Sequence, residues 1–189
     1  MERRRPSTRD PEPAPGRLEL VQAFLNTAKV KEHPERLASP LQLSRWLAHR
    51  GLVPAGTQMQ AADLKRALDL RQGLRGLLAA NRGAEIPAKA FDRLDAAIGD
   101  TQFQLRFDYD GSVGLETTPQ TFDAALAKIL ETVLWARSEG LWPRFKTCRN
   151  AECRRALFDV TKSLTTKWCT RRCGERMRGR HYRRRKANQ

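Results

Sequence analysis

Apolar residues recur every three or four positions through most of the first 140 residues, a spacing that predicts amphipathic helices. The first set begins at Leu18 and ends at Leu25. Capping signals mark the later sets: Ser39 stands before a proline at the first helical position, and Gly51 ends the same set. The Thr118–Pro119 pair is the expected start of the last helix. The helices predicted in this way cover about residues 17–28, 40–50, 59–81, 87–98 and 118–139.

The hydrophobic period shortens to two residues over positions 102–116. Apolar and polar side chains alternate there, and Asp110-Gly111 is a favoured two-residue turn. The pattern predicts an antiparallel hairpin with one buried face, made by Phe103, Leu105, Phe107, Tyr109, Val113 and Leu115. We therefore expect an α+β, mainly α fold.

Charge divides the chain into unequal parts. The net charge is +15, but residues 141–189 carry 16 Lys and Arg against three acidic residues, whereas the first 140 carry 20 against 18. Such a block is either a solvated tail or a surface for a polyanion. Four prolines in the first 16 residues predict a disordered arm. We expect the arm at 1–16, a helical domain at 17–142 and a basic module at 143–189, with no flexible linker between the last two.

All four cysteines lie in the basic module, at Cys148, Cys153, Cys169 and Cys173. Two close pairs separated by a short loop can converge on a tetrahedral Zn²⁺, the usual arrangement of structural sites. An iron–sulfur cluster and free or redox-active thiols are the alternatives. No apolar run is long enough for a membrane helix and no secretory signal is evident, so we expect a cytoplasmic protein, in which disulfides are disfavoured.

A metal also answers an energetic need, because the module has too little apolar content to form a core alone. The first cysteine pair encloses a tight loop, residues 156–160 form a predicted strand, and residues 165–168 are its expected partner. Cys173 falls in the first turn of a helix predicted over 170–186. Loop, hairpin and helix make a treble-clef type of zinc site. Asp159 is expected to order the loop before Thr161, and Trp168 to lie in the small core rather than stack on a base.

The residues around the second cysteine pair resemble a known family. Cys173-Gly174-Glu175-Arg176, preceded by Trp168-Cys169 and by Phe158-Asp159, resembles the CGNR zinc finger. Residues 24–27 (FLNT), Trp46-Leu47 and Leu70-Arg71 resemble the ABATE domain, which precedes that finger in bacterial proteins described as stress-induced transcription regulators. The resemblance implies structural zinc and a regulator of transcription. Glu175 departs from it, because the family name has Asn at that position.

On the predicted helix, Cys173, Met177 and His181 recur every fourth residue and form an expected inward stripe. Arginines cover the other faces, with Glu175 as the sole acid. The candidate nucleic-acid-binding residues are Arg171, Arg172, Arg176, Arg178, Arg180, Arg183 and Arg184. DNA is preferred to RNA because an Arg-bearing helix fits the major groove and few aromatic side chains are available for base stacking. Arg176 is equally well explained by a structural role, and a solvated basic tail is the alternative for the whole helix.

The helical domain is larger than a scaffold for one finger requires, so we expect it to bind a small-molecule effector or to form a homodimer. Asn26 and Arg71 are the candidate effector-pocket residues, because each lies near a predicted apolar face. The alternative is that they bond to the backbone or to a core carboxylate. His33 and His49 lack a partner at catalytic spacing, so we do not expect an enzyme. A zinc-stabilised protein-interaction module and an RNA-binding protein are the rival functions.

Overall fold

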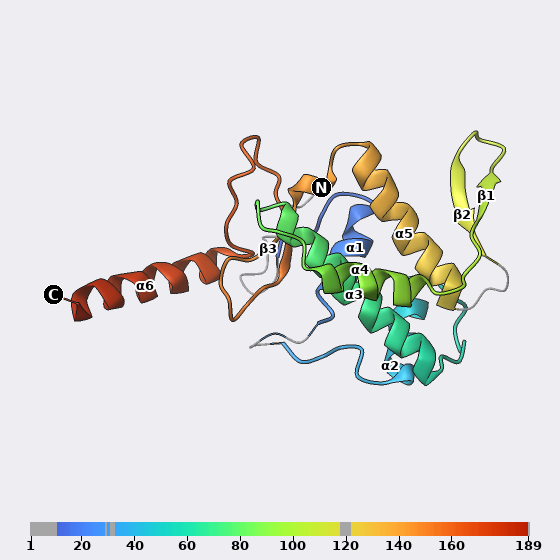
Figure 1. Cartoon of the computed structure of the whole chain (residues 1–189), viewed down its shortest axis with the longest axis horizontal. Coiled ribbons are helices and arrows are strands. Elements are labelled where there is room, and N and C mark those ends of the chain that lie inside the picture. The colour runs from blue at the N-terminus through green and yellow to red at the C-terminus, as the bar shows by residue number, and fades with distance from the viewer. Residues whose placement is uncertain (1–10, 29, 31–32, 118–121, 189) are drawn as a thin grey trace, which may run out of the picture.

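A computed structural model describes residues 11–28, 30, 33–117 and 122–188 of the chain. Five helices build the larger part: α1 (Leu18–Leu25), α2 (Pro40–His49), α3 (Ala61–Ala80), α4 (Ala88–Ile98) and α5 (Phe122–Ser138). Figure 1 shows α3 in the middle of this part, and it contacts α1, α2 and α4. The predicted helices and the α+β, mainly α class are confirmed.

Local signals explain where the helices begin and how closely they pack. The Ser39 hydroxyl accepts a hydrogen bond from the Gln42 amide at 3.2 Å, as an N-cap should. The predicted cap at Thr118–Pro119 lies outside the described residues. Gly76 lets α3 and α4 approach each other, because a Cβ there would lie 2.4 Å from the Cβ of Ala90.

The β-hairpin is present, but its predicted burial is wrong. Strands β1 (Gln104–Phe107) and β2 (Val113–Glu116) pair antiparallel, with Leu105 opposite Leu115. Leu105 is 67% exposed and Phe107 73% exposed. The hairpin stands at one end of the molecule and packs on α5 through β2, so that no second layer covers the outer face of β1 (Figure 1). Alternation identifies residues that share a face, but the tertiary packing decides whether that face is covered.

The predicted two-residue turn of this hairpin is also wrong. Phe107 pairs with Val113, which leaves the five residues from Asp108 to Ser112 between the strands. The Asp108 amide donates to the Ser112 carbonyl at 2.9 Å, and Gly111 adopts a φ of 80°. The loop is therefore Tyr109 to Gly111, one residue longer than the predicted turn, and the register of the strands shifts so that Phe107 faces Val113 instead of Gly114.

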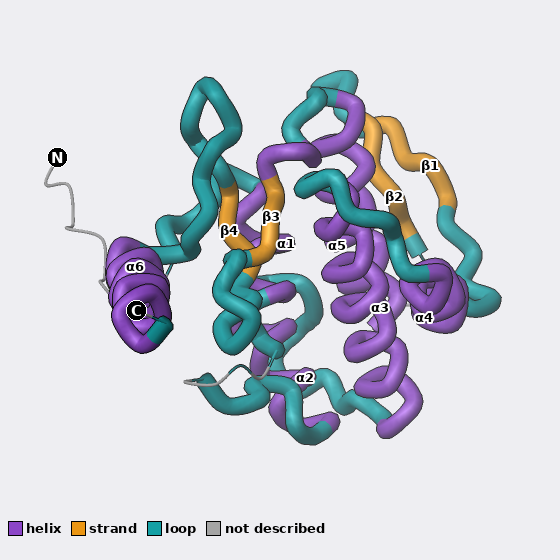
Figure 2. Tube along the Cα trace, turned by 60° about the vertical axis from the view of Figure 1, so that its left-hand side comes forward, coloured by secondary structure: helices purple, strands orange, loops and turns teal. Residues whose placement is uncertain are grey.

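The basic module consists of a 3₁₀ turn η1 (Trp142–Arg144), strands β3 (Phe145–Thr147) and β4 (Ala156–Phe158), and helix α6 (Arg171–Ala187). Strand β4 pairs antiparallel with β3, not with residues 165–168 as predicted. The true partner precedes the first cysteine, in a segment whose three residues carry no clear strand pattern. Helix α6 extends away from the rest of the molecule (Figures 1 and 2).

The two parts pack together, as the lack of a linker predicted. Phe145 and Ala156 belong to the same apolar core as the helices. Asn26, just after α1, donates to the Ala156 carbonyl at 3.0 Å and accepts from the Ala156 amide at 2.9 Å. Asn81 donates to the carbonyls of Trp142 and Phe145, each at 2.8 Å. These side chains complete the hydrogen bonding of backbone at the junction.

The N-terminal arm is described only from residue 11 onward. There the Gln22 side chain accepts from the Ala14 amide and donates to the Glu12 carbonyl, and Ala14 is buried. Residues 12–14 thus pack on the helical domain. Among the helices that the structure describes, none has the length and apolar character of a membrane span.

Replacing Asn26 by Ala should lower the free energy of unfolding by about 2 kcal/mol, because it leaves the amide and carbonyl of Ala156 without partners in a part-buried place. Urea unfolding of the zinc-loaded protein measures this loss. Gln58→Ala is the control, since Gln58 is exposed and should change stability by less than about 0.5 kcal/mol. A variant Asn26→Ala as stable as the parent protein would show that this junction contributes nothing.

Candidate metal centre and basic helix

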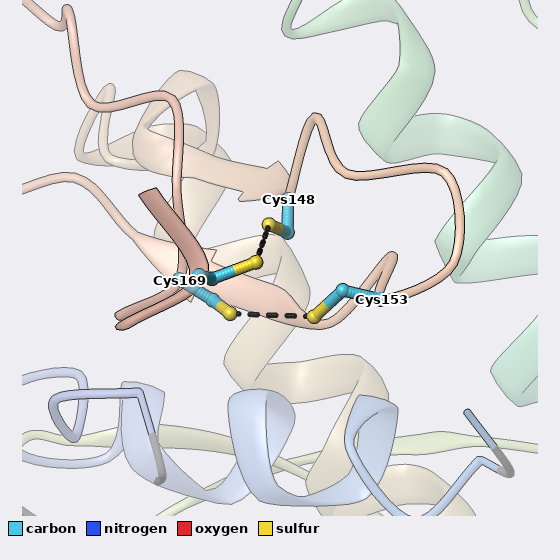
Figure 3. A group of neighbouring side chains, drawn as sticks. Cys148, Cys153 and Cys169 are labelled. Carbon is cyan, nitrogen blue, oxygen red and sulfur yellow. Dashed lines mark hydrogen bonds between the residues drawn. The ribbon is translucent and has the colours of Figure 1, made fainter. Parts of the chain in front are cut away.

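The four cysteine sulfurs converge on one point between β3, β4 and α6. All four Sγ atoms lie within 4.8 Å of one another, and the Cys148–Cys173 and Cys153–Cys169 pairs are 3.4 Å apart (Figure 3). Tetrahedral Zn–S bonds of about 2.3 Å would place the sulfurs about 3.8 Å apart. The cluster fits one tetrahedral zinc ion, and structural zinc is the cofactor of this protein.

Local structure holds each ligand in place. Cys148 follows β3, and its amide donates to the Arg155 carbonyl at 2.8 Å. The loop then turns back through Arg154, which has a φ of 46°. Cys173 lies in the first turn of α6, where its amide donates to the side chain of the N-cap Thr170 at 3.1 Å. The position of a ligand and the start of α6 are therefore set by the same turn.

Crowding of the thiols changes their acidity. Hydrogen bonds with Cys148 and then Cys169 lower the pKa of Cys153 to about 4. Hydrogen bonds with Cys148 and Cys153, followed by burial, raise the pKa of Cys169. The sulfurs are too close for all four to ionise by themselves, and a divalent cation would remove that conflict by binding the thiolates.

Asn150 supports the metal centre, and the sequence analysis missed it. The residue is buried between the first two cysteines, and its side-chain amide lies 3.4 Å from the Cys173 sulfur. The side-chain oxygen of Asn150 accepts a hydrogen bond from the backbone amide of Glu152 at 3.2 Å. An amide side chain inside a tight Cys-x4-Cys loop was the available signal, because such a loop leaves backbone N–H groups in need of acceptors.

Trp168 and Gly174 pack against each other beside the cysteines. Trp168 is partly buried against the cluster, which agrees with its predicted place in the core. A Cβ on Gly174 would lie 2.8 Å from the Trp168 ring, so glycine is the residue that allows this contact. The indole thus covers the first turn of α6.

Asp159 organises the loop that follows β4, as predicted. Its fully buried carboxylate accepts from the amides and hydroxyls of Thr161 and Thr166, and from Lys146 Nζ at 2.8 Å. Burial alone would raise the pKa of Asp159, but the hydrogen bonds from Lys146 and the threonines outweigh it and hold this pKa below its ordinary value. Lys146, also buried, was missed because a lysine in a short strand normally faces solvent.

The arginines of α6 fall into different environments. Arg171 pairs with Glu175 at 2.8 Å, and Arg180 pairs with Glu152 of the metal-binding loop at 2.6 Å. Arg176 is half-buried and lines a small cavity beside Cys169 and Cys173. The other candidate arginines are exposed and have no acidic partner among the described residues: Arg172, Arg178, Arg183 and Arg184.

The inward stripe predicted on α6 ends early. Cys173 is buried and Met177 half-buried, but His181 is exposed and lies outside the cysteine cluster. Helix α6 leaves the body of the molecule after its first turns, so no other part of the described chain packs against its distal part (Figures 1 and 2). Spacing alone predicted the common face but not where the contact ends.

Asn26 and Arg71, the candidate effector-pocket residues, both bond within the protein. Asn26 binds the backbone of Ala156. Arg71 is buried and donates to both carboxylate oxygens of Glu35, at 2.7 and 2.8 Å, and to the Thr27 hydroxyl. The structure does not bring the two side chains into one cavity among the described pockets. Their role toward an effector stays a prediction.

Comparison with known families covers nearly the whole described chain. The ABATE family model, described as "Putative stress-induced transcription regulator", matches residues 18–157. The CGNR zinc finger model matches residues 144–186. The two matches overlap over residues 144–157, which include β3 and the first two residues of β4, and both families are regulatory or zinc-finger families rather than enzyme families. No curated protein matches the chain.

Removal of zinc should unfold the basic module, because metal binding contributes on the order of 10–16 kcal/mol to small zinc fingers. We expect one zinc per chain by metal analysis, and loss of hydrogen-exchange protection over residues 145–173 after chelation. Cys173→Ser should lower the zinc content, whereas His181→Ala should keep it. Retention of zinc by Cys173→Ser, or its loss from His181→Ala, would contradict this assignment of ligands.

Replacing Asp159 by Ala should cost about 3–5 kcal/mol, because it leaves Lys146 buried without its counter-ion. The pKa of Asp159 in the folded protein lies below its ordinary value of 3.8. The stability that its carboxylate contributes is therefore fully present above pH 3.8 and is lost as the pH falls below this value. The loss should thus be equal at pH 8 and pH 6 in urea unfolding. Asp92→Ala, at an exposed site on α4, is the control and should change the free energy of unfolding little. If Asp159→Ala has as small an effect as this control, the prediction is contradicted.

Proposed function

Since the chain belongs to the ABATE family and ends in a CGNR zinc finger, we propose that it is a zinc-dependent DNA-binding regulator of transcription. Helix α6 is its DNA-contacting element in this proposal. The helical domain senses an effector or forms a dimer. The single observation that carries the proposal is a metal-anchored helix whose projecting surface is mostly cationic and has Glu175 as the one acid of the helix.

The dimensions of α6 suit a DNA groove. Its 17 residues span roughly 25 Å at about 1.5 Å per residue, and a major groove of about 12 Å width admits one helix. Only the first turns are occupied by packing on the metal centre, which leaves the distal part exposed around its circumference. Arginines there can reach phosphates on both sides of a groove as well as base edges.

The exposed arginines are the strongest candidates for DNA contact, because pairing with an acid lowers the gain from a phosphate contact. Arg172 and Arg178 have no acidic partner among the described residues, unlike Arg171 and Arg180. Arg176 lies beside the metal centre, so it supports that centre in addition to any contact it makes with DNA. The predicted set of seven arginines thus divides into residues that meet DNA directly and residues that also position α6.

Two observations favour rival functions. Tyr182 is exposed on α6 and offers one aromatic face for stacking on an unpaired base, as an RNA-binding protein would use. The exposed apolar side chains of β1 offer a surface for a protein partner, as an interaction module or a dimer would use. Neither observation accounts for the arginines of α6.

Replacing Arg172 and Arg178 together by Gln should weaken DNA binding and reduce the slope of log K against log[salt] by about two, because each phosphate contact contributes about one. Fluorescence anisotropy with random-sequence duplex DNA between 50 and 200 mM salt measures both quantities. The control is Arg36→Gln with Arg45→Gln, which removes the same charge at exposed sites of the helical domain.

The control variant should bind DNA like the parent protein. An equal loss in both variants would mean that only net charge matters, and binding that is indifferent to salt would contradict the proposal. Tighter binding of single-stranded RNA than of duplex DNA would favour the RNA-binding alternative.

A further inference from the structure

A cleft of about 510 Å³ opens between the helical domain and the metal-binding loop. One wall comes from α3 and from the start of α4, including Arg75, Lys89 and Arg93. The other wall is the loop that holds the first cysteine pair, from Ala151 to Arg154. The volume of the cleft is typical of sites for small molecules and is much larger than a bare ion needs.

The charges that line this cleft are unbalanced. Among the described residues that line it, four are cationic, Arg75, Lys89, Arg93 and Arg154, and Glu152 is the one with a carboxylate. Glu152 already pairs with Arg180 of α6 at 2.6 Å. For Lys89, Arg93 and Arg154, no acidic partner occurs among the described residues. A ligand with at least two negative charges would balance this excess.

Arg75 is the deepest of these cations and has no carboxylate bound to it in the described part of the chain. Its two terminal nitrogens donate to the carbonyls of Leu25, at 3.0 Å, and Arg154, at 2.6 Å. Burial, and then repulsion by Arg154 and Arg71, lower the pKa of Arg75 to about 10. A guanidinium held by backbone carbonyls in a positive field is a strong anion donor once a ligand enters.

The N-terminus of α4 points to the same chemistry. Pro87 and Lys89 of its first turn line the cleft. No side chain caps this terminus, and its first turn contains no acidic residue. The amide groups and the helix dipole there favour an anion, which an Asp or Glu would otherwise supply.

Most of the remaining lining residues are small and apolar, such as Ala28, Val30, Ala79 and Ala90, although Gln72 and Thr147 add two polar side chains. They leave room beside the cations for the uncharged body of a ligand. A single carboxylate would satisfy only part of the excess charge, whereas a phosphate ester carries nearly two charges and three acceptor oxygens. We propose that this cleft binds a phosphorylated small molecule of about nucleotide size, with its phosphate between Arg75, Arg93, Arg154 and the first turn of α4.

The cleft is also linked to the basic helix by side chains of the metal-binding loop. Its loop wall carries Cys153, a metal ligand, and Glu152, which is bonded to Arg180 of α6. In Figure 3, Cys153 lies across the sulfur cluster from Cys169, the ligand that precedes α6. A bound phosphate beside Glu152 would alter the Glu152–Arg180 pair and hence α6. This regulatory consequence rests on the proposed function, but the binding of the ligand does not.

Isothermal titration of the zinc-loaded full chain with AMP and with pyrophosphate tests the site. We expect saturable 1:1 binding of both, and no binding of adenosine, which lacks the phosphate. Lys89→Gln with Arg93→Gln should weaken AMP binding at least tenfold. Neither side chain makes a hydrogen bond or ion pair within the described part of the chain, and urea unfolding of the variant checks that stability is kept. The pair Arg36→Gln and Arg45→Gln, of equal charge change, should bind AMP like the parent protein.

Three outcomes would overturn the proposal: no saturable binding of AMP and pyrophosphate at millimolar concentration, equal binding of adenosine and AMP, or unchanged AMP binding by the Lys89/Arg93 variant. Duplex DNA titrated into the same samples separates the two proposals. If AMP binds while DNA does not, the site stands and the proposed function fails. If the Lys89/Arg93 variant loses DNA affinity and the parent protein binds no AMP, the cleft is part of a DNA-contacting surface instead.

Discussion

Convergence of four thiolates on one zinc ion is the constraint on which the basic module depends. The module has few apolar side chains, and the cysteines occupy the centre that a hydrophobic core would fill. Because Cys173 lies in the first turn of α6, the metal also fixes where this helix begins and in which direction it leaves the molecule. The cationic surface of α6 therefore has a defined position only in the metal-bound protein.

The metal centre is not an independent unit, because its β-hairpin is built into the helical domain. Phe145 and Ala156 lie in the main core, and Asn26 completes the hydrogen bonding of β4. The buried Lys146–Asp159 pair then holds the loop between β4 and the second cysteine pair. Any ligand or partner that acts on the helical domain near this junction has a short path to the zinc ligands.

Glu175, which stands where the family pattern has Asn, faces solvent and pairs with Arg171 on the preceding turn of α6. An amide role close to the metal is served here by Asn150, which lies in the first cysteine loop and reaches the Cys173 sulfur. The departure at Glu175 consequently affects the charge of α6 more than the metal centre. It neutralises one arginine at the start of a helix whose other exposed residues are mostly basic.

Spacing along the chain was enough to predict the helices, the Ser39 cap and the four-cysteine site, because these depend on contacts within one turn or one short loop. It predicted neither the exposed face of β1, nor β3 as the partner of β4, nor the buried Lys146. Each of these depends on a surface formed by residues far away in the chain. Alternation and periodicity show which side chains share a face, and only the packed structure decides whether a face meets protein or solvent. The cleft beside Arg75 belongs to this second class, since its two walls are about 80 residues apart and neither wall forms a pocket without the other.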